Sequence, residues 1–310
     1  MKADDSSLEP GEYKTVHEAA VNLLNKGGAW GRLPTPVDDL MEAARLKVAR
    51  RSVFDLQAMA EYAMKVGKQT AATVKSAIEK VLGIYDVQEN VVHIDETVNQ
   101  EKQTFLKLHE TGHKEIPHQS GLFKFIQDCA KHLAPETAEL FEREANTFAS
   151  IVLFQDNTFA AMTADYEFSI KVPLKYGRKF GASVYASIRE YVRRSHRACA
   201  VIVLMPTEVC AVKGLNATVR RVQLSTDFFK RFGSLVLPAE LTYSHDLMAA
   251  VPMGSRKMSS PVGLTLDDQN GVPHEFVAEG FKTPYNTFIL LHCTATLTTS
   301  FIIPSLTAAQ

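Results

Sequence analysis

Residues 104–117, TFLKLHETGHKEIP, hold two histidines and a glutamate in the spacing H-E-x-x-H. On a helix, His109 and His113 share a face, so both can direct a ring nitrogen at one ion. Neutral imidazole is a good zinc ligand, and a catalytic zinc site takes three protein ligands and leaves a fourth position open for water. The spacing therefore predicts a Zn2+ site, with Glu110 as the general base that acts on this water.

Gly112 lies inside this predicted helix, where glycine costs about 1 kcal/mol relative to alanine. A chance match on a solvated helix would not need a glycine there. We therefore expect a neighbouring element to approach the helix closely at Gly112.

The third zinc ligand must come from elsewhere in the chain. The long metzincin pattern would place a third histidine at position 119, which is Gln119. His118 is one residue out of that register, so we interpret it as a loop residue that could assist substrate binding or proton transfer. A glutamate from a second helix is the other common solution.

Such a helix is predicted over residues 140–153, LFEREANTFASIVL. Glu142 and Asn146 are four residues apart and share a face, whereas Glu144 is rotated from Glu142 by about 200°. Glu142 is therefore the predicted ligand. Asn146 is expected to orient a ligating histidine or carboxylate by a hydrogen bond, and Glu144 is expected to face solvent.

These two helices together resemble the ImmA/IrrE metallopeptidases, in which an HExxH helix is followed by an E-x-E-A-N-x-F-A helix, here FEREANTFAS at residues 141–150. Residues 83–96, GIYDVQENVVHIDE, resemble the edge strand that precedes the zinc helix in that family. Residues 33–48, LPTPVDDLMEAARLKV, resemble its N-terminal helical part. The resemblance covers about residues 16–197 and implies a gluzincin-like peptidase whose substrate is a helix-turn-helix repressor.

The chain departs from the family pattern after each ligand helix. Residues 152–155 read VLFQ where an L-L-M-P-like tail is usual, and Lys114 and Glu115 follow the second histidine where apolar residues are commoner. These departures concern the shape of the substrate cleft and leave the ligand set unchanged.

Residues 91–95 are predicted to form a short strand, and an edge strand beside a zinc helix can bind an extended peptide by backbone pairing. Tyr85 and His93 are the polar side chains nearby. Each could assist the oxyanion or could simply pack on the sheet.

Composition favours a cytoplasmic protein without a membrane partner. The formal net charge is -1, the N-terminus lacks the basic and apolar parts of a signal peptide, and apolar runs are only of strand length. The four cysteines are scattered, which fits a reducing compartment. Cys129 lies between the two ligand helices, where it is either a small buried residue or an inhibitory thiolate ligand of the zinc.

Helices are predicted over residues 12–25, after Pro36, twice within 54–82, and through most of 157–195. Residues 157–197 resemble the small helix-turn-helix-like unit that follows the family's peptidase core. Within it, residues 176–194 carry a basic side that could contact DNA or an acidic repressor, or could be an ordinary solvated face. The basic residues are Arg178, Lys179, Arg189, Arg193 and Arg194, joined by Arg197 just beyond the segment.

From residue 198 the pattern changes to strands. They are predicted at 199–205, 219–224, 248–252, 262–266, 275–278, 287–291 and 299–303, with a short helix near 227–232. Resemblance to two-domain members of the family implies a GAF-like α+β module over 198–310. Such a module could sense a small molecule or nucleic acid, hold the repressor, or form a homodimer.

The predicted fold class is thus α+β: a mainly helical zincin-like domain with a small sheet over 1–197, then the GAF-like domain. The predicted function is a zinc endopeptidase that cleaves a helix-turn-helix repressor and so derepresses stress, DNA-damage or phage-defence genes. One alternative is a toxin-antitoxin or phage-related peptidase with another substrate. The other is a DNA-binding or sensor regulator in which the zinc is structural.

Overall fold

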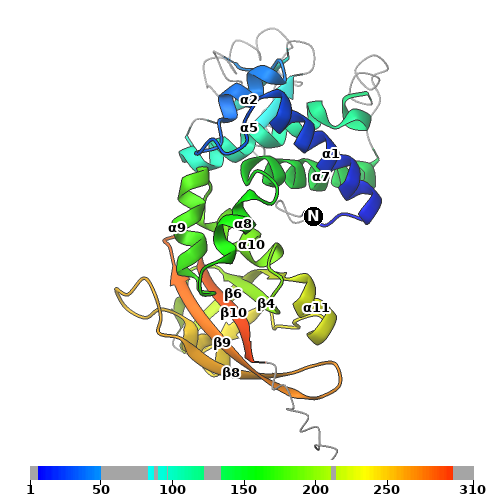
Figure 1. Cartoon of the computed structure of the whole chain (residues 1–310). Helices are drawn as coiled ribbons and strands as arrows, with labels where there is room; N and C mark the ends of the chain where they lie inside the picture. The colour runs from blue at the N-terminus through cyan, green and yellow to red at the C-terminus, as the bar shows by residue number, and fades with distance from the viewer. Residues whose placement is uncertain are drawn as a thin grey trace, which may run out of the picture. The chain divides into compact units, whose positions relative to one another are not determined.

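The computed structural model divides the chain into two compact units (Figure 1), one of residues 1–165 and 173–187 and the other of residues 166–172 and 188–310. The chain is mixed α/β, in agreement with the predicted α+β class. The predicted boundary at residue 197 stays a prediction. The structure describes residues 6–49, 83–86, 90–95, 97–121, 134–210 and 214–295. The helices predicted within 54–82, the strand at 299–303 and Cys129 lie outside these residues.

The first unit begins with helices α1, Pro10–Lys26, and α2, Val37–Ala43, which confirm two predicted helices. At the start of α1 the Glu12 carboxylate accepts the backbone N–H of Glu9 at 2.8 Å. The apolar positions of α1 recur at helical spacing and are all buried: Val16, Ala19, Ala20, Leu23 and Leu24.

Two longer helices carry the predicted metal ligands: α5, Gln100–Glu115, and α7, Pro135–Leu153. The Asn99 side chain caps α5 by accepting the N–H of Lys102. Helix α7 packs against both α5 and α1 (Figure 1). A Cβ atom on Gly112 would lie 3.1 Å from Phe148 Cδ1 and 3.3 Å from Ala145 Cα, so the expected close approach at Gly112 is confirmed.

A three-stranded sheet lies beside α5. Its strands are β1, Lys47–Val48, β2, Gly83–Asp86, and β3, Val91–Ile94, in the order β1-β3-β2. Strand β3 pairs in parallel with β1 and antiparallel with β2. The strand predicted at 91–95 exists, but its interpretation as an edge strand is wrong because both of its sides are paired. Within the described residues, a peptide could pair only with β1 or β2.

Lys114, one of the two charged residues that follow the second histidine, links the end of α5 to this sheet by hydrogen bonds. Its Nζ donates to the carbonyl oxygen of Arg45 at 3.1 Å and to Asn90 Oδ1 at 2.9 Å. Arg45 and Asn90 both adopt positive φ, at 57° and 53°, in the turns beside β1 and β3. Lys114 therefore stabilises two turns of strained backbone.

Three shorter helices follow: α8, Thr158–Ala164, α9, Lys171–Phe180, and α10, Val184–Arg193. They confirm the helices predicted through most of residues 157–195. Gly181, at φ 75°, ends α9 in the left-handed conformation. A Cβ atom on Gly177 would lie 1.9 Å from Ser187 Oγ, so α9 and α10 cross where glycine leaves room.

The basic residues predicted on this segment do not form one free face. Glu190 is only 2 % exposed, and its carboxylate pairs with Arg193 and, at 3.0 Å, with Arg194 Nε. Arg189 Nη2 donates to Gln223 Oε1 at 3.5 Å. Several of the basic side chains are therefore used within the fold.

In its described residues, the second unit contains a seven-stranded antiparallel sheet in the order β5-β6-β4-β10-β9-β8, with β7 paired to β6. Strands β4, β6, β8, β9 and β10 are labelled in Figure 1. Five of the six strands predicted from 199 to 291 are confirmed, whereas β5 and β7 were not predicted. Residues predicted as a strand at 248–252 contain instead the 3-10 helix η1, Asp246–Ala250. The strands are β4 Cys199–Leu204, β5 Glu208–Cys210, β6 Gly214–Leu224, β7 Glu240–Thr242, β8 Val262–Asp267, β9 Pro273–Lys282 and β10 Thr287–Ala295; the predicted short helix is α11, Thr226–Phe232.

Strand β4 is buried along its whole length, which explains its unbroken apolar sequence. Ala200, Ile202 and Leu204 point into the main core of this unit together with side chains of η1, α11 and β7. None of the helices in the described part of the chain has the length and apolar character needed to cross a membrane.

Candidate metal centre

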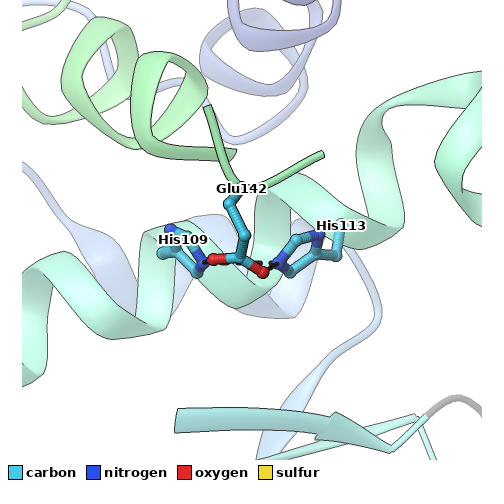
Figure 2. A group of neighbouring side chains, drawn as sticks. All are labelled: His109, His113 and Glu142. Carbon is cyan, nitrogen blue, oxygen red and sulfur yellow. Dashed lines mark hydrogen bonds and ion pairs between the residues drawn. The ribbon is translucent and has the colours of Figure 1, made fainter. Parts of the chain in front are cut away.

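Helices α5 and α7 bring His109, His113 and Glu142 together, with their ligand atoms within 4.8 Å of one another. Figure 2 shows the carboxylate of Glu142 between the two imidazole rings. His109 Nε2 is 3.2 Å from Glu142 Oε2, and His113 Nε2 is 3.7 Å from Glu142 Oε1. The two Nε2 atoms are 3.3 Å apart. The helical spacing of each sequence motif thus places all three side chains at one point.

Each histidine is held through its other ring nitrogen by a side-chain amide. His109 Nδ1 is 3.1 Å from Asn146 Oδ1, the contact expected for Asn146. His113 Nδ1 is 2.7 Å from Oε1 of Gln119. In both cases the ring N–H donates to an amide oxygen, which leaves the Nε2 lone pair directed at Glu142.

Three electron-pair donors that face one another repel, and a cation between them would relieve this repulsion. Burial lowers the pKa of His109, but its hydrogen bond to Glu142 and the charges of Glu110 and Glu142 outweigh burial and raise it overall. Burial and the charge of His109 lower the pKa of His113. Without a metal, Glu142 therefore favours a proton on His109. Two imidazoles and a carboxylate are also the donor set of catalytic zinc, which would displace that proton.

Glu110 lies beside this cluster without being one of its ligand atoms. Glu110 is only 6 % exposed. Among the described residues, none donates a hydrogen bond to its carboxylate. A buried carboxylate beside three candidate ligand atoms is placed to act on a water bound there.

Residues 75–189, which include every residue of this cluster, match a family model. It is the IrrE N-terminal-like domain of the peptidase M78 family. No curated protein matches the chain. Among solved structures, a Mycobacterium tuberculosis transcriptional regulator is similar at 14 % identity and a TM-score of 0.49, over 90 % of this chain and 87 % of that one.

Glu144, two residues after Glu142, is not solvated as predicted. It is 1 % exposed, and its Oε2 accepts from Gln119 Nε2 at 2.6 Å and contacts His118 Nε2 at 2.7 Å. His118 packs edge-on against Phe141, with ring centroids 5.6 Å apart. The prediction failed because the side of α7 opposite Glu142 is covered by the turn that follows α5.

The other predicted site residues are not part of the cluster. Tyr85 Oη donates to Asn90 Oδ1 at 3.3 Å, and burial together with the charges of Asp86 and Glu115 raises the pKa of Tyr85. His93 is half-buried on β3. Their oxyanion role and the inhibitory role of Cys129 stay predictions.

The departure from the IrrE-like pattern at the end of α7 serves packing. Gln155 is fully buried, and its Oε1 accepts the N–H of Gly31 at 2.8 Å. Its Nε2 donates to the Arg32 carbonyl oxygen at 2.8 Å. Phe154 packs in an aromatic cluster with Phe159 and Phe180. These side chains join α7 to neighbouring elements.

Gly112→Ala is expected to weaken zinc binding and to destabilise the metal-free protein by about 1–2 kcal/mol. The added Cβ would press on Phe148 and on the backbone of Ala145, and an overpacked core outweighs the gain in helix propensity. Any shift of α7 also moves Glu142. Thermal unfolding and a zinc titration measure both effects. Gly11→Ala is the control, since a Cβ there meets nothing within 4 Å; a stabilised Gly112→Ala with unchanged zinc affinity would contradict this expectation.

Proposed function

We propose that this chain is a zinc-dependent endopeptidase that cleaves a helix-turn-helix transcriptional repressor. The observation that carries the proposal is the convergence of His109 Nε2, His113 Nε2 and the Glu142 carboxylate, with buried Glu110 next to them. The match of residues 75–189 to a peptidase family supports the hydrolytic part. The identity of the substrate rests on the ImmA/IrrE resemblance.

A bound zinc supplies Lewis acidity, which makes water a competent nucleophile near neutral pH and polarises a carbonyl group. Glu110 accepts the proton of the attacking water and then delivers it to the nitrogen of the leaving amine. Asn146 and Gln119 hold the two imidazoles so that their Nε2 atoms face inward. Strand β2, at the edge of the small sheet and against α5, is where an extended substrate would pair.

The number of ligands favours catalytic over structural zinc. In the part of the chain that the structure describes, three side chains offer atoms to the centre, whereas structural zinc is normally closed by four. A bound water would occupy the remaining position.

Cleavage of the repressor would derepress stress, DNA-damage or phage-defence genes. The scattered cysteines support a cytoplasmic site of action. The second unit would act as a GAF-like sensor of a small molecule or nucleic acid, or as a dimerisation module. The antiparallel sheet formed by its described residues supports a compact accessory domain.

The test is cleavage of the helix-turn-helix protein encoded beside this gene, with zinc-loaded, chelator-treated and zinc-restored protein. We expect a defined cleavage product from the first and third preparations and none from the second, by mass spectrometry of the fragments. Cleavage that survives complete zinc removal would refute the zinc mechanism. No cleavage by loaded protein, with DNA or damaged-cell extract added, would refute the repressor as substrate. An antitoxin encoded nearby, tested in parallel, addresses the toxin-antitoxin alternative.

A further inference from the structure

We propose that Gln119, itself held by Glu144, is a positioning residue that fixes the ring of His113 for metal binding. This inference rests on the proposed function, because it assumes a metal at His109, His113 and Glu142. It adds a residue that the H-E-x-x-H spacing and the pattern of the second helix do not contain.

The chain reverses direction directly after α5, and this turn returns Gln119 to the metal ligands. Ile116 ends the helix with extended backbone, at φ -75° and ψ 115°, and its N–H still bonds to the Gly112 carbonyl oxygen. Residues 117–121 then form a further helical turn. Gln119 on this turn is completely buried. Its amide is therefore surrounded by protein groups.

Two acceptors determine which way the Gln119 amide points. Its Nε2 donates to Glu144 Oε2 at 2.6 Å and to the Phe141 carbonyl oxygen at 3.3 Å. Because a carboxylate and a carbonyl only accept, the NH2 group must lie on this side. Oε1 consequently faces His113 Nδ1, which must carry the proton. The relay from Glu144 through Gln119 thus selects the tautomer of His113 whose Nε2 lone pair can bind a metal.

Glu144 is itself fixed from a second direction. The same Oε2 atom is 2.7 Å from His118 Nε2, whose side chain is 43 % exposed, whereas the Glu144 side chain is 2 % exposed. The charge of Glu144 strengthens the hydrogen bond from Gln119. The relay therefore runs from the surface to the metal ligand through one buried carboxylate and one buried amide.

Loss of this relay should affect the metal more than the fold. A ligating histidine is oriented, and its basicity raised, by the acceptor that binds its other N–H, and removal of such acceptors costs about 10–100-fold in metal affinity. Without Gln119, His113 can place its proton on Nε2, which removes a ligand. His109 would keep its own acceptor, Asn146.

The experiment is a zinc titration against a chromophoric chelator with wild type, Gln119→Leu and Gln155→Leu. Gln155 is the matched control, since it is also fully buried and its amide bonds to Gly31 and Arg32 in the same unit. Both variants should unfold at lower temperature than wild type without metal. Only Gln119→Leu should bind zinc about 10–100-fold more weakly, and only its cobalt-loaded form should show altered d–d absorption bands.

A double variant that exchanges the side chains of residues 119 and 144 distinguishes the loss of the hydrogen bond to His113 from the effect of changed side-chain volume. Gln119→Glu combined with Glu144→Gln restores an acceptor for His113 Nδ1 and a donor at position 144, so the folded double variant should bind zinc more tightly than Gln119→Leu. Gln119→Glu alone places two carboxylates together and should not recover affinity. Equal affinity of Gln119→Leu and wild type, or no recovery in the folded double variant, would overturn the proposal.

The outcomes also separate this proposal from the proposed function. Folded wild type that binds no zinc would overturn both. Zinc binding by wild type without cleavage of any peptide would remove only the endopeptidase, because the affinity comparison does not depend on activity.

Discussion

Glu110→Gln is expected to lower the rate of peptide cleavage by about 10²–10⁴-fold while zinc content stays at the wild-type level. Glutamine has the shape of glutamate but cannot accept the proton of the attacking water at neutral pH. Glu110 is buried beside the cluster without contributing one of its three ligand atoms. The loss should therefore appear in kcat. Initial cleavage rates and metal analysis of the same preparation measure the two quantities.

Glu101→Gln is the matched control for this variant. Glu101 is exposed in the first turn of the same helix, so the same change there should alter neither cleavage nor zinc. If Glu110→Gln kept activity within about tenfold of wild type, Glu110 would not be the general base. If it lost zinc, Glu110 would have a ligand role that the geometry does not support.

The three side chains of the candidate metal centre could be located from the sequence because each lies on a regular helix. His109 and His113 on α5, and Glu142 and Asn146 on α7, are pairs four residues apart, so 3.6-residue periodicity alone gives their common faces. Gly112 indicated that another element packs closely against α5 beside the two histidines. Helical periodicity was therefore enough to predict the shared faces of residues on regular helices.

Gln119 and Glu144 were missed because their roles depend on a non-local turn. Periodicity correctly rotated Glu144 away from Glu142, but it could not show that residues 117–121 cover that side of α7. The position of Gln119, where a metzincin would carry its third histidine, was the available signal. A polar residue at that distance from the motif can orient a ligand instead of being one.

The errors in the fold have similar causes. Strand β3 was predicted at an edge because residues 83–96 resemble an edge strand. Its partner β1 has only two residues, too few to leave a hydrophobic pattern that would have indicated the pairing. The apolar run at 248–252 fits either a strand or a buried helical turn, and periodicity cannot decide between them. Gly181 was a usable signal for the break between α9 and α10, since glycine ends helices in the left-handed conformation.

Glu142→Gln is expected to weaken zinc binding by more than about 100-fold and to abolish cleavage at ordinary zinc concentrations. Removal of an outer hydrogen-bond partner already costs about 10–100-fold, and Glu142 contributes the ligand itself and its charge. Burial raises the pKa of Glu142, but the hydrogen bond and charge of His109 outweigh burial and lower it overall, so the native group is a carboxylate. The amide would lose that charge among two imidazoles. Zinc titration and metal analysis measure the loss.

Two variants on the same helix make this result specific. Glu139→Gln removes a carboxylate from the exposed surface of α7 and should leave zinc binding unchanged. Glu144→Gln should bind zinc within about tenfold of wild type, because the glutamine oxygen can still accept from Gln119 and Glu144 contacts neither Nε2 atom. A Glu144→Gln variant that lost zinc while Glu142→Gln retained it would mean that α7 presents the opposite face to α5. That result would contradict both contacts of His109, with Glu142 and with Asn146, because both depend on the same rotation of α7 about its axis.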